Sequence, residues 1–543
     1  MSTVPEKENG VTGLIKKPEY LVFFLIFIVG ISFAFLTNHA WEDFWITFRV
    51  SKNLAAGLGP VYTAGERVHA FTSPLNMLIP ALIVYLTGNI SDALVLWVYR
   101  VLCCILLGVS AVFFYRISKK NAFGPVPTFL LIGLLTTDAK IIDFSINGQE
   151  VAFMVFFIAA TLYILTAVRN RVPLKLGLAW AGLMYTRPDG FIYAGGIALG
   201  FLVFNRGIWF TNLRPEILKT YLKAAGIAAA LYAPWFLWAW YYYGSPIPHT
   251  IIAKGLRFEQ LPPWAYLTGL AWFPAHSPLV TFLPAYGFAG WPRAIYFYSF
   301  ILSFLCLIYW MLPSRNHAAR AASFGFFLCH YYLSFIIRFP ATWYIPSTTI
   351  LGIFILGHAA KDLLELSGSV RNSPIRGFLT SLTRGLVTLV LIANFVILAC
   401  VAVQFRIVQR VDEEGIRRSV GLWLKYNALK TDTVFLEPLG YIGYYSNLKM
   451  YDFPGLASKE VVAVRKKFRT NSWKVLIPEL KPDWVVRRPW EHWDQGPDDY
   501  LKTNYTKIGT FSAYKTIASY DFLPGIKNAY LDSVFCIYKR NKG

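Results

Sequence analysis

Residues His39–Asn76 read HAWEDFWITFRVSKNLAAGLGPVYTAGERVHAFTSPLN and follow an apolar segment that ends near Thr37. Acidic, basic and aromatic side chains are interleaved in this stretch, and a long series of further apolar segments follows it. Charged side chains next to a bilayer surface are costly unless they act on something. We therefore interpret the stretch as a functional loop at a membrane surface.

The composition excludes a soluble protein. Of the 543 residues, 56% are hydrophobic and 15% are charged, whereas soluble chains have about 25% charged residues. Runs of about 20 apolar residues recur, which is the length that crosses a bilayer. The net charge of +22 does not indicate nucleic-acid binding, because the Lys and Arg residues are scattered over loop ends and a tail. The six cysteines form no disulfide pattern.

The distribution of basic residues predicts the topology. Lys7, Lys16 and Lys17 precede the first apolar segment, which we interpret as an uncleaved signal anchor, so the N-terminus is expected to be cytoplasmic and residues 39–76 external. The run 74–86 is too short to span and predicts an interfacial helix. Eleven spans are predicted, at residues 20–36, 93–115, 122–137, 149–168, 174–186, 190–205, 224–243, 294–312, 321–337, 342–357 and 385–405.

The remaining segments complete the predicted architecture. The proline-containing run 264–287 is expected to be broken helix on the external face, and residues 358–384 a cytoplasmic loop. The fold class is a polytopic α-helical membrane protein with a C-terminal soluble α/β domain. We place the membrane domain at 1–405, with interfacial helices in an external loop at 39–92, and the external domain at 406–543. In that domain the pattern predicts strands at 433–436, 484–486 and 533–538, and helices at 414–426 and 458–469.

In this topology a mixed set of charges collects at the external face. Such a set favours a site for an anionic ligand held at membrane level, for example a lipid-linked phosphate. Structural roles compete with this interpretation, because Asp43 can pair with Arg49, Arg187 can pair with Asp189, and Lys254 can snorkel to the interface. The set consists of Glu42, Asp43, Arg49, Glu66, Arg67, Asp138, Lys140, Glu150, Arg187, Asp189, His249, Lys254 and Arg338.

Several motifs in this order resemble a known family. They are Glu42–Leu75, Gly148-Gln149-Glu150, Thr186-Arg187-Pro188-Asp189-Gly190, the stretch from Tyr243-Gly244 to Lys254, and Gly440–Ser446 followed by Asp452. Together they resemble the polytopic glycosyltransferases of the GT-C class that use polyprenyl-phosphate sugars, and within it the bacterial branch of the mycobacterial terminal arabinofuranosyltransferase. His249 stands where that branch commonly has Asn, and Asp189 where Glu is frequent. These departures leave the sugar and the acceptor open.

The resemblance implies an inverting sugar transfer at the periplasmic side of a bacterial inner membrane. Asp43 matches the position of the catalytic base, with Glu42 as the neighbouring acid, and Lys254 and Arg187 are candidates to hold the donor phosphate. The acceptor is a glycan, a lipid or a protein, and arabinofuranose is the candidate sugar. No cofactor is required by the pattern, although Asp43, Glu42 and Glu150 could offer oxygens to a divalent cation. Further donor-site candidates are Arg49, Glu66, Arg67, Glu150, Asp189, His249 and Arg338.

Three other functions stay open. A transporter of lipid-linked sugars would place its polar residues near the membrane midplane in repeated halves, whereas here they gather at one surface. An oligosaccharyl transferase of the O-antigen-ligase type would act on the same side with a diphosphate-linked donor. A structural assembly subunit would not need Asp43.

Overall fold

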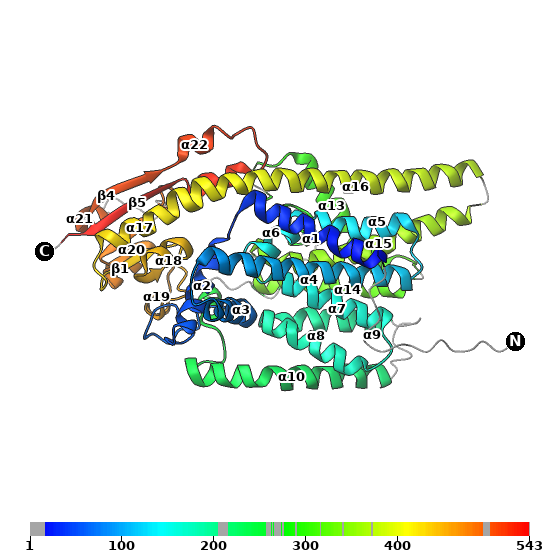
Figure 1. The fold of residues 1–543 in the computed structure, drawn as a ribbon, viewed down its shortest axis with the longest axis horizontal. Helices are drawn as coiled ribbons and strands as arrows, with labels where there is room; N and C mark the ends of the chain where they lie inside the picture. Colours follow the sequence, from blue (N-terminus) through cyan, green and yellow to red (C-terminus); the bar gives the residue numbers. More distant parts are fainter. Residues whose placement is uncertain are drawn as a thin grey trace.

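The computed structural model describes residues 17–204, 215–256, 262, 264, 273, 276–287, 290–314, 316–338, 341–370, 373–491 and 500–541. A bundle of helices makes up most of it, and a smaller part that contains a β-sheet lies at one end of the bundle (Figure 1). We call this smaller part, residues 409–541, the C-terminal region.

The helices of the bundle form from the apolar runs of the sequence. They are α1 (Lys17–Thr37), α2 (Glu42–Ala55), α3 (Pro74–Leu86), α4 (Asp92–Lys120), α5 (Pro125–Thr137), α6 (Ala139–Ile146), α7 (Val151–Ala167), α8 (Val172–Thr186), α9 (Gly190–Phe204), α10 (Pro215–Tyr243), α11 (His249–Gly255), α13 (Arg293–Ile308), α14 (His317–Tyr331), α15 (Pro346–Ser369) and α16 (Ser373–Val408). A π-helix, η3 (Tyr332–Ile337), extends α14, and a short 3-10 helix, η4 (Thr342–Tyr344), precedes α15.

The structure confirms a membrane protein with several spans. Each of the eleven predicted spans contains a helix. Among the described residues six helices are long and apolar enough to cross a membrane, or seven if α6 and α7, which are bent by 120° to each other, count as one span. Since α5 has 13 residues and α9 has 15, the total of eleven stays a prediction.

The structure bears on two of the predicted connecting segments, at 264–287 and 358–384. The loop conformation expected at 358–384 is wrong, because α15 continues to Ser369 and α16 begins at Ser373; the cytoplasmic side of this segment stays a prediction. Helices commonly extend past the apolar layer, and Lys361 forms an i,i+4 ion pair with Glu365 there, with N and O 3.5 Å apart. Of the broken helix expected at 264–287, residues 265–272, 274 and 275 lie outside the described residues, and residues 276–287 form turns and bends.

The stretch 39–76 contains α2 and the start of α3. In α2 the aromatic side chains of Phe44, Trp45 and Phe48 are buried on one face. The 13-residue α3 begins at Pro74, and the hydroxyl of the N-cap residue Ser73 accepts a hydrogen bond from the Asn76 amide at 3.1 Å. These bounds confirm the short helix predicted for residues 74–86; its interfacial position stays a prediction.

The C-terminal region contains one five-stranded sheet. Its strands are β1 (Thr433–Leu436), β2 (Lys449–Asp452), β3 (Trp484–Arg487), β4 (Tyr505–Ser512) and β5 (Val534–Arg540), in the order β2-β1-β3-β5-β4. β1 is parallel to β2 and to β3, while β5 is antiparallel to β3 and to β4. The flanking helices are α17 (Arg418–Asn427), α18 (Gly440–Ser446), α19 (Lys459–Phe468), α20 (Trp473–Leu480), α21 (Tyr500–Asn504) and α22 (Tyr514–Ala518).

The strands β1, β3 and β5 and the helices α17 and α19 confirm the elements predicted for the C-terminal region. Its connection to the bundle is helical throughout. α16 continues through a π-helix, η5 (Gln409–Arg417), into α17, so that residues 374–427 form one helix of 54 residues. The boundary that we placed at residue 405 therefore lies inside this helix.

Candidate active site

The N-terminus of α2 is fixed against the turn between α6 and α7. The Trp41 amide donates a hydrogen bond to the Asn147 carbonyl at 3.0 Å. The next residue in this turn, Gly148, has a φ of +97°, and a β-carbon there would overlap the Phe44 ring. The turn therefore depends on glycine for both its backbone conformation and its close approach to α2. Asp43, the second residue of α2, is held at the positive end of the helix dipole.

Asp43 has the environment of a general base. Its side chain is half-buried and makes no hydrogen bond or ion pair within the described part of the chain. Burial raises the pKa of Asp43 to about 6, the positive charge of Lys254 opposes this increase, and the negative charges of Glu150 and Glu437 add to it. The carboxylate is thus accessible, unpaired and more basic than an ordinary aspartate.

Arg187 is bound on both sides by carboxylates. Its Nη1 lies 2.8 Å from Oε1 of Glu150, which caps α7, and its Nε lies 2.9 Å from Oδ1 of Asp189, between α8 and α9. The guanidinium carbon also lies 3.7 Å from the centre of the Tyr344 ring. The Tyr332 hydroxyl donates to Asp189 at 3.2 Å. The guanidinium of Arg187 therefore has its charge balanced by Glu150 and Asp189, without a bound ligand.

Lys254 differs from Arg187 in its exposure and in its contacts. It lies in the last turn of α11, is exposed, and forms no ion pair with any residue in the described ranges. Its Nζ lies 6.0 Å from the centre of the Trp343 ring. Trp343 and Tyr344 are neighbours in η4, so one short segment lies beside both Lys254 and the Arg187 cluster.

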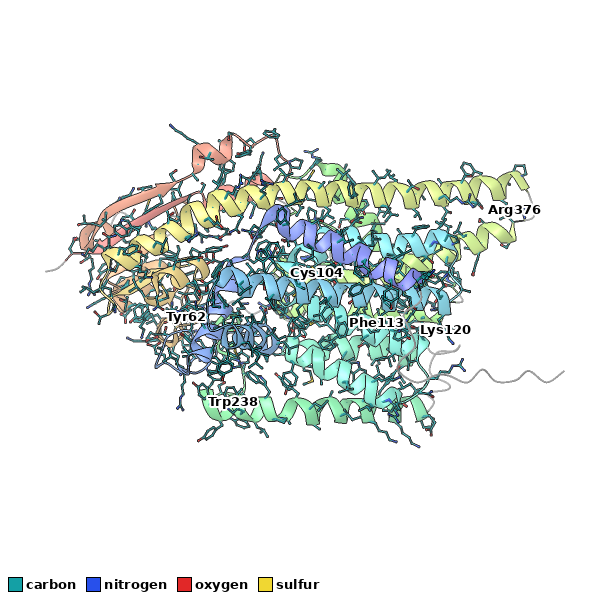
Figure 2. The ribbon with its side chains drawn as sticks, in the orientation of Figure 1. Tyr62, Cys104, Phe113, Lys120, Trp238 and Arg376 are labelled. Carbon is teal, nitrogen blue, oxygen red and sulfur yellow. The ribbon has the colours of Figure 1, made fainter. Side chains whose placement is uncertain are left out.

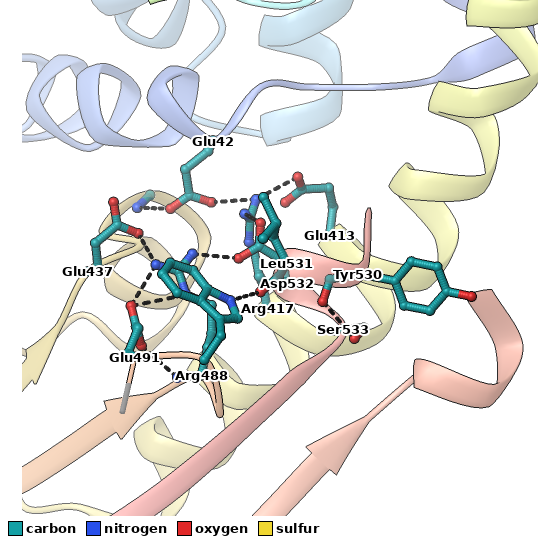
Figure 3. Close-up of polar contacts among 12 residues, drawn as sticks. Glu42, Glu413, Arg417, Glu437, Arg488, Glu491, Tyr530, Leu531, Asp532 and Ser533 are labelled. Carbon is teal, nitrogen blue, oxygen red and sulfur yellow. Dashed lines mark hydrogen bonds and ion pairs between the residues drawn. The ribbon is translucent and has the colours of Figure 1, made fainter. Parts of the chain in front are cut away.

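Glu42 anchors the C-terminal region to α2. Its Oε1 accepts a hydrogen bond from the Gly440 amide at the start of α18, and its Oε2 lies 3.0 Å from Nη1 of Arg417 (Figure 3). A β-carbon at Gly440 would overlap the Glu42 carbonyl. Glycine at position 440 is therefore what lets α18 approach Glu42 so closely.

Two arginines of the C-terminal region organise a network of ion pairs behind Glu42 (Figure 3). Arg417 pairs with Glu413 and with Asp532, both at 2.6 Å. Asp532 also pairs with Arg488 at 2.6 Å. Arg488 further pairs with Glu437 and Glu491, each at 2.6 Å. We call these residues, together with Glu42, the junction network, because they join α2 to the sheet.

Two adjacent acids of η5, Asp412 and Glu413, have raised pKa values. Burial raises the pKa of Glu413 to about 8, while the charge of Arg417 opposes this increase. Burial likewise raises the pKa of the adjacent Asp412 to about 8, and the charge of Asp532 adds to it. Burial thus favours the protonated form of both carboxyls.

The overall fold is shared with solved structures. The crystal structure of ArnT from Cupriavidus metallidurans in the apo state aligns with a TM-score of 0.52 at 13% sequence identity, over 90% of this chain and 95% of that one. The chain has the GT-C fold. The cryo-EM structure of the arabinofuranosyltransferase AftD from Mycobacteria aligns with a TM-score of 0.50 at 12% identity, over 97% of this chain and 40% of that one.

Sequence comparison confirms the relationship that the motifs predicted. The chain is 25% identical over 274 residues to a terminal β-(1→2)-arabinofuranosyltransferase of Corynebacterium glutamicum, which is 45% of this chain and 38% of that protein. The chain therefore matches well under half of the length of that enzyme. Residues 405–531 match a domain of unknown function, DUF8728.

Not every residue predicted for the donor site of this GT-C chain faces Asp43. Arg49 is buried, donates to the carbonyls of Gly443 and Leu448 at 2.7 and 3.1 Å, and thereby ties α2 to the C-terminal region. Glu66 pairs with Lys449 at 2.6 Å. Both residues thus connect the loop to the sheet.

The other three predicted donor-site residues are placed as follows. Arg67 is exposed and lies 4.9 Å from the Tyr242 ring centre. The Nε2 of His249 is 3.3 Å from the Ser458 carbonyl, and burial lowers the pKa of His249. Arg338 is half-buried at the end of η3, with a φ of +69°.

A divalent cation does not fit the acids that the sequence suggested as ligands. No group of three or more His, Cys, Asp or Glu side chains among the described residues is arranged to hold a metal ion. Glu42 and Glu150 each direct an oxygen to an arginine instead. Sequence reasoning overlooked Arg417, Arg488 and Glu437, because the ion pairs that join them to Glu42, to Asp532 and to one another link residues remote in the chain.

Proposed function

We propose that the chain is an integral membrane glycosyltransferase that moves a sugar from a polyprenyl-phosphate donor to an acceptor hydroxyl, with inversion. The observation that carries this proposal is Asp43, which is half-buried, raised in pKa to about 6 and within electrostatic range of Lys254, and neither residue forms an ion pair among the described residues. A base and a phosphate-binding cation on one side are what this reaction needs.

In the proposed transfer, one bond forms and one bond breaks at the anomeric carbon. The acceptor oxygen attacks the anomeric carbon and forms the new glycosidic bond, while the bond from that carbon to the donor phosphate oxygen breaks. The hydroxyl proton passes to Asp43, and the electron pair of the broken bond leaves with the polyprenyl phosphate. The phosphate gains one negative charge in this step, and Lys254 stabilises it.

Lys254 is a better candidate for the phosphate than Arg187. Both were predicted for this role, but the charge of Arg187 is already compensated by Glu150 and Asp189. A group that binds two buried carboxylates has little attraction left for a third anion. Arg187 thus shapes the site by holding the α6–α7 turn against the α8–α9 turn.

The sugar proposed is arabinofuranose. The support is the likeness to two proteins named as arabinofuranosyltransferases, of Corynebacterium glutamicum and of Mycobacteria. The departures at His249 and Asp189 lie in segments near Lys254 and Arg187, where they would adjust the fit to the donor sugar.

The site is proposed to face the periplasm. Lys120 and Arg376 lie at the end of the bundle remote from the C-terminal region, whereas Tyr62 and Trp238 lie beside it (Figure 2). Arg116, near Lys120, pairs with Glu19 at the start of α1 at 3.0 Å. Basic residues favour the cytoplasmic side. This orientation puts the start of α1 inside the cell and places Asp43 and the C-terminal region outside.

Transfer can be tested in membranes that contain the overexpressed chain and radiolabelled polyprenyl-phosphate arabinofuranose. The proposal predicts label covalently attached to an envelope acceptor, in proportion to the amount of the chain. Label that crosses the membrane but stays on its lipid would show a transporter instead. Incorporation only from a diphosphate-linked glycan donor would show a ligase, and either result would refute the proposal.

The pKa of Asp43 predicts the pH dependence of the reaction. Because the base acts as carboxylate, and because its pKa is about 6, kcat/KM should be nearly constant above pH 7 and fall about tenfold per pH unit below about pH 6. The measurement is the initial rate at subsaturating acceptor from pH 4.5 to 8. Donor binding, measured over the same range, is the control. A rate that stays constant down to pH 4.5 would exclude Asp43 as the base.

A further inference from the structure

Trp490 lies on the C-terminal region beside the junction network, in a fixed orientation. The guanidinium carbon of Arg488 lies 4.3 Å from the centre of its ring. Its indole N–H donates a hydrogen bond to the Leu531 carbonyl at 2.5 Å. The side chain is nevertheless 41% exposed. Trp490 is thus held on one face and at its polar atom, while a large part of the ring remains open to solvent.

Glu437 is held by the same arginine. Its Oε2 accepts from Nη2 of Arg488 at 2.6 Å, and its side chain is 38% exposed, whereas that of Arg488 is 6% exposed. The ion pairs of Arg488 with Asp532 and Glu491 fix the guanidinium in turn. One buried cation therefore positions both an exposed aromatic ring and an accessible carboxylate.

This pair of side chains adjoins the proposed base. Glu437 follows β1 and stands three residues before Gly440, whose amide binds Glu42, the neighbour of Asp43. The negative charge of Glu437 contributes to the raised pKa of Asp43, which agrees with this proximity. A molecule bound at Glu437 and Trp490 would reach toward the base from the side of the C-terminal region.

We propose that Trp490 and Glu437 form a carbohydrate subsite that holds the acceptor chain while its hydroxyl approaches Asp43. An aromatic face binds the C–H surface of a sugar ring, and a fixed carboxylate accepts hydrogen bonds from its hydroxyls. The assignment of the bound sugar as acceptor rests on the proposed function. The subsite gives the domain that matches DUF8728 a role, which is to bind the acceptor beside the active site.

The experiment measures oligosaccharide binding to the full chain in nanodiscs, with a synthetic linear hexaarabinofuranoside in one arm and mannohexaose in the other. The wild type is expected to bind at least one of these probes. Trp490→Ala should weaken that binding about tenfold, Trp490→Phe should restore most of it, and Glu437→Gln should weaken it several-fold. Transfer by the same variants should show a raised KM for the acceptor and an unchanged KM for the donor.

Two exposed residues elsewhere in the C-terminal region serve as matched controls. Tyr426→Ala removes an aromatic ring that is 78% exposed, and Glu479→Gln removes a carboxylate whose side chain is 40% exposed. Neither should change binding.

Each outcome decides the proposal. Failure of the wild type to bind either probe, or equal affinity of the wild type and Trp490→Ala, would overturn the subsite. If Trp490→Ala loses oligosaccharide binding because it misfolds, Trp490→Phe and donor binding would fail as well. That result would show that Trp490 has a structural role, and it would also overturn the subsite. Oligosaccharide binding that depends on Trp490 in a chain without transfer activity would contradict the proposed function alone.

Discussion

Asp43→Asn is expected to lower kcat/KM by about 10³-fold, which corresponds to about 4 kcal/mol of transition-state stabilisation. The amide has the size of the carboxylate but accepts no proton from the attacking hydroxyl. Because Asp43 has no hydrogen-bond or ion-pair partner among the described residues, the exchange breaks no contact there. The measurement is transfer from the labelled donor, with expression and donor affinity determined in parallel.

The matched control for this variant is Glu216→Gln. Glu216 lies in the first turn of α10, its side chain is 79% exposed, and its salt bridge to Lys219 is a surface pair at 3.2 Å. This substitution should leave both transfer and donor affinity unchanged. Full activity in Asp43→Asn would refute the assignment of the base. Loss of donor affinity together with turnover would instead place Asp43 in the donor site.

Arg187→Met is expected to destabilise the protein by about 3–5 kcal/mol, because it leaves Glu150 and Asp189 buried without their common partner. The side chains of Arg187 and Glu150 are 5% and 6% exposed, so water cannot replace the lost interaction. The measurement is unfolding of the detergent-solubilised chain by denaturant or heat. Combining Arg187→Met with Glu150→Gln and Asp189→Asn should recover much of the loss.

Lys467→Met provides the comparison for a surface ion pair. The side chain of Lys467 is 67% exposed and its Nζ lies 3.5 Å from Glu479, so this substitution should cost less than about 1 kcal/mol. A stable Arg187→Met protein that has lost only its affinity for the donor would show that Arg187 binds the phosphate. That result would reverse the roles that we assign to Arg187 and Lys254.

The helices, and the polar turn that carries Asp43 beside the first of them, could be predicted from the sequence because their causes are local. Apolar runs fold as helices wherever the backbone must satisfy its own hydrogen bonds in lipid. The stretch 39–76 is polar and aromatic next to such a run, and it does form the N-terminal turn that carries Asp43. The strands β1 and β3 were equally evident, because they are continuous β-branched or aromatic runs that are buried.

The sequence did not reveal features that depend on remote partners. β4 was missed because it is an edge strand with mostly exposed side chains, so no apolar alternation marks it. For Arg187 the sequence offered a ligand role and a structural one. Only the fold shows that Glu150, from the start of another helix, is its second partner. Glu42 also looked like a second catalytic acid, but Arg417 and Gly440 bind both of its oxygens.

The uninterrupted helix from the bundle into the C-terminal region has a mechanical consequence. Its 54 residues correspond to roughly 80 Å of length, of which the hydrocarbon layer takes about 30 Å. A continuous helix resists bending, so it keeps the sheet at a fixed distance from the lipid headgroups. In the proposed reaction, acceptors that present their hydroxyl at that height are within reach of Asp43, and those anchored much nearer to the bilayer or farther from it are not.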